Sequence, residues 1–219
     1  MLKLGEKGAI PQNEADSYAI APHIPCGFVT PELLRKLADV AEKFNAKAIK
    51  ITGAARIALI GLKEDDIEPA WAELGLAKGA AVGLCVRSIR TCPGSTYCRL
   101  GKQDAIGVGM KLDETYHALQ LPGKFKMAVS GCKLSCAESW VRDIGLIGDR
   151  DGWILTIGGN VGSQPRIGKE LISGLDDAAA LTAVADVVNY YKDNAQGAER
   201  LGKMIERVGL EPFAAAVKK

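Results

Sequence analysis

Hydrophobic residues in the first third of the chain follow two different spacings. Between residues 31 and 45 they recur every three or four positions, which predicts an amphipathic helix, and Thr30 is a suitable N-cap for it. Short apolar runs at 48–51 and 57–60 predict two strands, and residues 64–74 predict a second helix. This alternation of helices and strands is typical of half of a small α+β sheet unit.

Two further segments complete the N-terminal part. Residues 1–17 are mostly polar, and we expect them to form a loose arm. Residues 18–28 are extended in character but contain two prolines. Glycines on either side of 76–78 indicate a boundary there, so we predict one domain at 1–79 and a second at 80–219.

The second domain also mixes strands with helices. Its apolar runs predict four strands, at 82–89, 125–129, 144–147 and 153–157, the last two forming a hairpin. Helical spacing predicts three helices, at 102–119, 176–192 and 195–208. The apolar stripe of the second helix is typical of core packing rather than of a partner groove.

Composition excludes several classes of protein. The 219 residues are 47% hydrophobic and 25% charged, which is ordinary for a globular protein. A net charge of +2 gives no electrostatic case for nucleic acid, and no apolar run of about 18 residues predicts a membrane span. The N-terminus does not resemble a signal peptide, and Cys26 and Cys85 are expected to be buried apolar side chains. We therefore expect a cytoplasmic protein.

The remaining four cysteines carry the most chemical information. Cys92 and Cys98, then Cys132 and Cys136, lie in two loops rich in glycine and serine, and each loop follows a predicted strand. Thiolates bind iron–sulfur clusters or zinc. The wide spacing of the first pair favours a cluster, while zinc and ordinary free thiols remain alternatives.

These cysteines belong to a longer set of motifs. Residues 87–168 resemble the cofactor-binding half of the sulfite/nitrite reductase family, through segments 91–94, 97–99, 122–126, 131–132, 136–138, 159–160 and 165–166. The resemblance implies an α+β fold, a ferredoxin-like half domain followed by a sirohaem- and [4Fe-4S]-binding domain. It also implies that the cluster ligands are Cys92, Cys98, Cys132 and Cys136, with Cys136 bridging the cluster to the sirohaem iron.

The resemblance assigns roles to basic residues as well. It implies that Arg56, Arg87, Lys124 and Lys126 face the substrate, and that Arg90, Arg99 and Arg166 bind sirohaem carboxylates, with the roles of Arg87 and Arg90 interchangeable. Lys124 and Lys126 are two apart on a predicted strand, so both point to one face and suit a grip on an oxyanion. Alternatively, the two lysines could lie on the solvent-exposed face of an edge strand, and the arginines could form surface ion pairs.

The expected function is the six-electron reduction of sulfite to sulfide. The chain has no dinucleotide- or flavin-binding motif, so electrons must come from an external donor protein. Alternatives are nitrite reduction to ammonia, a non-catalytic sirohaem and iron–sulfur electron-transfer subunit, and a zinc-stabilised protein. The familiar assimilatory enzymes of this family have two tandem copies of the unit, whereas this chain has one. We therefore expect a homodimer, and the alternative is a single chain that holds its sirohaem with a more open distal side.

Overall fold

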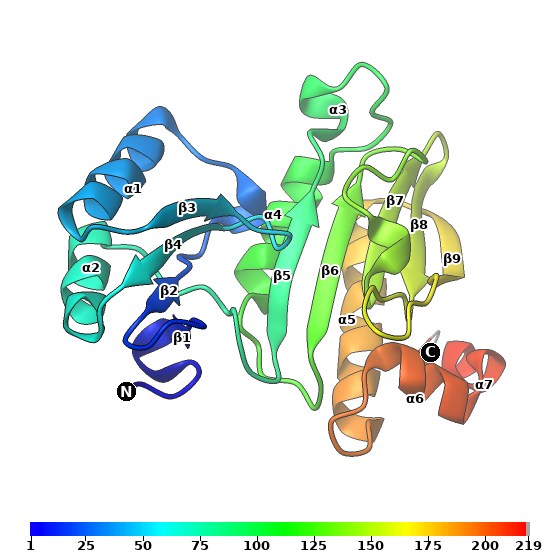
Figure 1. The fold of residues 1–219 in the computed structure, drawn as a ribbon. Helices are drawn as coiled ribbons and strands as arrows, with labels where there is room; N and C mark the ends of the chain where they lie inside the picture. The colour runs from blue at the N-terminus through cyan, green and yellow to red at the C-terminus, as the bar shows by residue number, and fades with distance from the viewer. Residues whose placement is uncertain (218–219) are drawn as a thin grey trace. The chain divides into compact units, whose positions relative to one another are not determined.

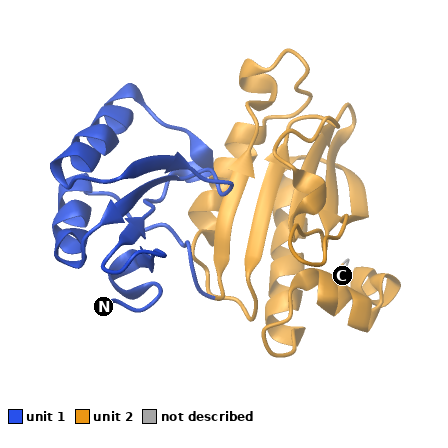
Figure 2. Cartoon of the chain, in the orientation of Figure 1, with its two compact units in different colours: residues 1–83 blue, residues 84–219 orange. Residues whose placement is uncertain are grey.

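The computed structural model describes residues 1–217. The chain divides into two compact units, Met1–Gly83 and Leu84–Lys219 (Figure 2). No helix of the described part is both long and apolar enough to cross a membrane.

The first unit is a four-stranded antiparallel sheet with two helices (Figure 1). Its strand order is β1-β2-β4-β3, where the strands are β1 (Ala9–Pro11), β2 (Tyr18–Ile20), β3 (Ala48–Ile51) and β4 (Ile57–Leu62). The helices are α1 (Pro31–Lys43) and α2 (Ile67–Leu74). The Thr30 side chain accepts a hydrogen bond from the Leu33 amide at 3.2 Å, so the expected cap begins α1.

The prediction of a loose N-terminal arm is wrong. Strand β1 pairs with β2, and Ala9 is fully buried in the core of the unit. The Leu2 amide also donates to the Tyr18 hydroxyl at 3.0 Å. A three-residue strand is too short for a periodic sequence signal, and it forms because β2 offers a free edge.

The second unit contains a five-stranded mixed sheet in the order β5-β6-β7-β8-β9. Strands β5, β6 and β7 are parallel, and β8 and β9 are antiparallel additions. The strands are β5 (Val86–Thr91), β6 (Phe125–Ser130), β7 (Ile144–Asp149), β8 (Gly152–Ile157) and β9 (Lys169–Leu175). The helices are α3 (Gly94–Tyr97), α4 (Ala105–Tyr116), α5 (Asp177–Asn194), α6 (Leu201–Val208) and α7 (Leu210–Val217).

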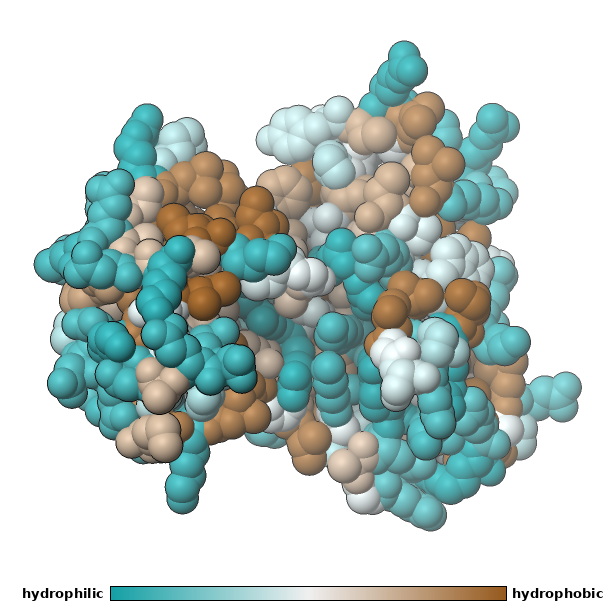
Figure 3. Space-filling model, viewed as in Figure 1, coloured by the Kyte–Doolittle hydropathy of each residue, from teal (hydrophilic) through white to brown (hydrophobic). Residues whose placement is uncertain are grey.

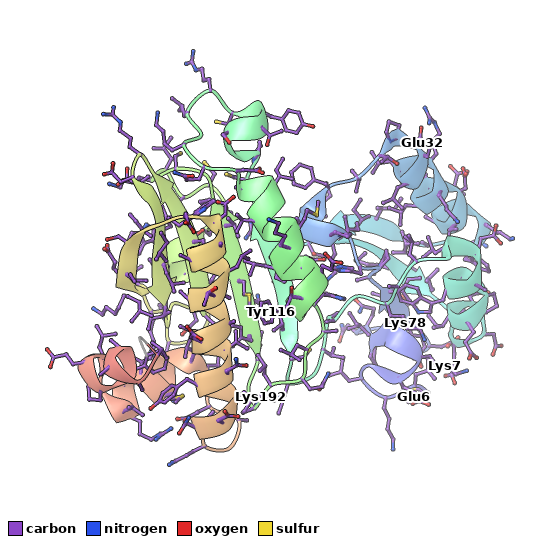
Figure 4. The ribbon with its side chains drawn as sticks, turned by 180° about the vertical axis from the view of Figure 1, so that it is seen from behind. Glu6, Lys7, Glu32, Lys78, Tyr116 and Lys192 are labelled. Atoms are coloured by element: carbon purple, nitrogen blue, oxygen red, sulfur yellow. The ribbon has the colours of Figure 1, made fainter. Side chains whose placement is uncertain are left out.

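Helices α4 and α5 cover one face of this sheet. Seen from behind, they run in front of the strands, with Tyr116 on α4 and Lys192 on α5 (Figure 4). The Phe125 ring of β6 packs on Tyr191 of α5, with ring centroids 5.2 Å apart. Because side chains alternate along a strand, Lys124 and Lys126 point to the opposite face.

The C-terminal part departs most from prediction. Strand β9 and helix α7 were not predicted, and the helix expected at 195–208 begins only at Leu201. Residues 195–200 instead form a loop, which includes the N-cap Arg200. The helix expected at 102–119 is likewise shorter, because Asp104 caps α4 and its side chain accepts from the Gly107 amide at 3.0 Å.

Candidate functional site

The two cysteine loops emerge from the same edge of the sheet. Thr91 and Val129 are register partners near the carboxyl ends of the parallel strands β5 and β6. Cys92 directly follows β5, and Cys132 lies two positions after β6. The Gly131 amide donates to the Cys92 sulfur at 3.1 Å. A parallel register thus brings the two thiol pairs together at one edge.

Glycine is required where the loops touch. The Gly131 carbonyl accepts the amides of Lys102 and Gln103 at 2.7 and 3.1 Å. A Cβ atom on Gly131 would lie 2.7 Å from the Gly94 Cα, and Gly94 itself has a φ of +56°. The glycines beside Cys92 and Cys132 therefore allow close backbone approach, a role that the motif alone did not reveal.

The four thiols are not alike in exposure. Cys92, Cys98 and Cys132 are half-buried, whereas Cys136 is exposed, and all four are free thiols. Among residues 1–217 no three His, Cys, Asp or Glu side chains gather tightly enough to hold a single metal ion. The four thiolates of a [4Fe-4S] cluster bind four different irons, whereas those of a zinc site bind one ion.

A group of cations lies on the open face of the same strands. Lys126 is half-buried on β6, and Lys124 directly precedes that strand, one residue outside the predicted run. Burial, followed by repulsion from Lys124, Arg142 and Arg200, lowers the pKa of Lys126 to about 8. Burial, followed by repulsion from Arg87 and Arg200, also lowers the pKa of Lys124. These cations thus repel one another around the lysine pair, and a bound anion would relieve that repulsion.

Hydrophilic side chains occur on the surface over β5 and β6 in the view that shows this face (Figure 3). Arg90 on β5 donates to Glu138 at 2.8 Å, and Arg142 pairs with the same carboxylate. Glu138 follows Cys136 by two residues, so this ion-pair network ties the second cysteine loop to β5. Arg142 is 5% exposed, and its Nε finds no hydrogen-bond partner among the described residues.

A hollow of about 620 Å³ lies beside Lys124. Its lining includes Lys124, Arg166, Arg200, Lys203 and the loop 160–164. Arg166 forms a two-point ion pair with Glu206, at 2.6 and 3.0 Å. Arg166, which we predict to bind a sirohaem carboxylate, is therefore already paired with a residue of α6, and the cavity lies next to it.

Two further predicted residues lie on other segments of the chain. Arg99 is exposed in the first cysteine loop. Arg56 is 6% exposed and belongs to the first unit, where its guanidinium donates to the Ala80 carbonyl at 3.2 Å. A substrate-facing role for Arg56 therefore remains a prediction.

Two residues of the site were missed at the sequence level. Asp143 is fully buried and accepts hydrogen bonds from Arg200 and from the Lys126 amide. Asp143 and Arg200 are separated by 57 positions, so no local spacing connects them. An aspartate at the start of an otherwise apolar strand was the only available signal.

The family models match both units. The nitrite/sulfite reductase ferredoxin-like half domain matches residues 10–77, and the nitrite and sulphite reductase 4Fe-4S domain matches residues 82–219. Together with the thiol-bearing sheet edge, these matches define an iron–sulfur oxidoreductase. The chain belongs to the nitrite and sulphite reductase family, and the predicted α+β fold class and family are confirmed.

Individual relatives agree with this assignment. The chain is 42% identical over 211 residues to the assimilatory-type sulfite reductase of Nitratidesulfovibrio vulgaris, covering 96% of this chain and 97% of the relative. It is 38% identical over 194 residues to the nitrite reductase [NAD(P)H] of Bacillus subtilis, covering 89% of this chain but 24% of the relative. The crystal structure of dissimilatory sulfite reductase I has a TM-score of 0.81 at 15% identity, over 93% of this chain and 69% of that chain. This last likeness shows a shared fold.

The residues present fit the cofactors of the family, a [4Fe-4S] cluster and sirohaem, so the predicted cofactor pair is confirmed. Soft thiolates at one sheet edge suit the irons of a cluster. Sirohaem is rich in carboxylates, which need cationic partners when they are buried. Buried donors that find no partner among residues 1–217 occur on β5 and just before β7, namely the hydroxyls of Ser88 and Thr91 and the Nε of Arg142.

Proposed function

We propose that the chain is a sulfite reductase that converts sulfite to sulfide with electrons from an external donor protein. The observation that carries this proposal is the strand pair β5 and β6, whose carboxyl ends carry the thiol loops and whose open face carries the cations. Similarity over nearly the full length of an assimilatory-type sulfite reductase supports sulfite as the substrate. Reducing conditions such as those of the cytoplasm would keep the thiolate ligands intact.

The proposed ligands are divided between two cofactors. Cys92, Cys98, Cys132 and Cys136 would hold the cluster, and the sulfur of Cys136 would also meet the sirohaem iron. Arg90, Arg99 and Arg166 would bind sirohaem carboxylates. When bound, the two cofactors supply the electron path and the iron at which the anion is reduced.

The residues of the chain would supply charge and protons. Bisulfite takes up six electrons and six protons to give hydrosulfide and three waters, so oxygen must be protonated repeatedly. Lys126, with a pKa near 8, can donate a proton at neutral pH and regain one from water. Lys124 and Arg87 would neutralise the anion beside it, and we propose that Arg56 adds a cation from the first unit.

Nitrite reduction to ammonia is the second candidate. The nitrite reductase of Bacillus subtilis is 38% identical over 194 residues, so a closely similar chain occurs in an enzyme named for nitrite. A protein that reduced nitrite much faster than sulfite would replace the proposed substrate and leave the site assignment intact.

The test is a spectrum followed by turnover. Anaerobically purified protein should contain about four to five irons per chain and extractable sirohaem. With a reduced low-potential dye as donor, it should then reduce sulfite stoichiometrically to sulfide. Iron without tetrapyrrole would favour the electron-transfer subunit, and a colourless protein containing zinc would contradict both functions.

A further inference from the structure

A fully buried carboxylate holds the strand that carries Lys126. Asp143 directly precedes β7 and is 0% exposed. Its Oδ2 accepts the main-chain amide of Lys126 at 2.8 Å, while its own carbonyl accepts the Gly158 amide at 2.8 Å. The Asp143 side chain thus takes the place of a neighbouring strand's carbonyl at the start of β6.

The C-terminal segment neutralises this carboxylate. Arg200, the N-cap of α6, donates its Nε to Oδ1 of Asp143 at 3.1 Å and its Nη2 to Oδ2 at 2.5 Å. A two-point guanidinium–carboxylate contact fixes orientation as well as charge. Arg200, far along the chain from Lys126, thus bonds the same carboxylate that accepts the Lys126 amide.

More cations than anions act on Lys126. Within the described residues, Asp143 raises the pKa of Lys126, against burial and three cations, Lys124, Arg142 and Arg200. Tyr191 on α5, which interacts electrostatically with Asp143, stays uncharged in the relevant range because burial raises its pKa to about 12. The charge of Lys126 at neutral pH is therefore sensitive to the Asp143–Arg200 pair.

We propose that Asp143 and Arg200 are positioning residues for Lys126, through which the C-terminal segment holds the lysine that binds and protonates the substrate anion. This inference rests on the proposed function for the identity of the anion. The coupling of the three residues can be measured in protein that carries no cofactor.

The first test measures the charge of Lys126 directly. Trace acetylation with mass spectrometry reports the neutral fraction of each amine as a function of pH. In Asp143→Asn the amide oxygen can still accept the Lys126 N–H, but the negative charge is lost. A fall of about one unit from a pKa of about 8 raises the neutral fraction of Lys126 about fivefold at pH 7, so it should then be labelled about fivefold faster there than in the unaltered chain. A folded Asp143→Asn protein with an unchanged labelling rate would overturn the proposal.

The second test uses the other partner, and it stands if Asp143→Asn does not fold. In Arg200→Gln, amide hydrogen exchange at Lys126 should accelerate about tenfold, since its acceptor loses its anchor. The matched control is Arg207→Gln, which removes a cation and an ion pair with Glu199 from the same helix. Equal exchange at Lys126 in the two variants would overturn the positioning role.

Activity measurements distinguish a failure of this inference from a failure of the proposed function. In loaded Asp143→Asn protein, the alkaline limb of the pH profile for sulfite reduction should move about one pH unit toward acid, with activity recovered at low pH. A uniform loss at every pH would instead indicate a merely structural role and overturn the inference. If unaltered protein reduces no sulfite but the labelling and exchange results hold, the proposed substrate fails and the positioning pair stands.

Discussion

At the scale of single residues, the surroundings of Cys136 and Lys126 agree with the roles proposed for them. Cys136 is the exposed member of the four candidate ligands, and the two-residue link to Glu138 ties its loop to Arg90 and Arg142. Exposure leaves this sulfur accessible to a second cofactor beside the cluster. Lys126 combines partial burial with a lowered pKa, which is typical of a residue used for proton transfer.

Cys136→Ser should uncouple the two cofactors. A serine oxygen is a harder and less acidic ligand than a thiolate, so the bridge to sirohaem should be lost. We expect a changed sirohaem absorption spectrum and loss of sulfite turnover. Cys85→Ala, which removes a buried thiol outside the loops, should keep the spectrum. An unchanged spectrum and full activity in Cys136→Ser would show that another residue is the bridge.

Lys126→Arg should change the pH dependence of anion binding. The lysine loses its positive charge as pH rises through about 8, whereas arginine stays charged. The KM for sulfite should therefore rise above about pH 8 in the unaltered enzyme and stay flatter in Lys126→Arg, with a lower kcat because arginine is a poor proton donor. Bisulfite itself also titrates, which would change the KM of every variant alike. Lys124→Arg, which keeps Lys126, is therefore the control. A KM that rises equally in all three proteins would contradict this role.

At the level of elements, the N-terminus of α4 supports the first cysteine loop. The Asp104 carboxylate accepts the Gly107 amide at 3.0 Å and the Thr96 hydroxyl at 3.2 Å. Thr96 lies in α3, between Cys92 and Cys98. One cap therefore both begins a helix and restrains the loop that holds two thiols.

Asp104→Ala should weaken the fold and the cluster together. Loss of the cap should lower the free energy of unfolding by about 1 kcal/mol and speed the loss of cluster absorbance in air. Thr30→Ala removes a comparable cap in the first unit, so it should cost a similar amount in urea unfolding without affecting the cluster. Equal rates of cluster loss in both variants would show that Asp104 acts only through global stability.

For the molecule as a whole, the single copy of each domain bears on assembly. The two family models match this chain once each, over residues 10–77 and 82–219. We expect a homodimer because a two-fold axis would restore the paired arrangement of tandem enzymes. Sedimentation equilibrium of loaded protein should give twice the mass of one chain, and specific activity should fall on dilution. A monomer that keeps full activity when dilute would exclude this arrangement.

Much of the fold could be predicted from the sequence. Local signals placed the helix after Thr30, the strands 48–51 and 57–60, and the hairpin of β7 and β8, because periodicity and caps act within a few residues. The short strand β1 and the irregularly paired β9 escaped prediction, since they depend on pairing with a neighbour. The cysteine spacing by itself favoured a cluster over zinc, whereas the role predicted for the Lys-Phe-Lys run came from the family resemblance.

What the sequence determined by itself was therefore the type of the elements with strong local signals, the candidate ligand set and the family. Tertiary structure alone decided that two loops share one sheet edge, that Gly131 and Gly94 touch, and that Arg200 reaches the Asp143 carboxylate that holds Lys126. The physical reason is distance along the chain. Periodicity and capping are local, whereas strand register and buried ion pairs depend on how remote segments pack.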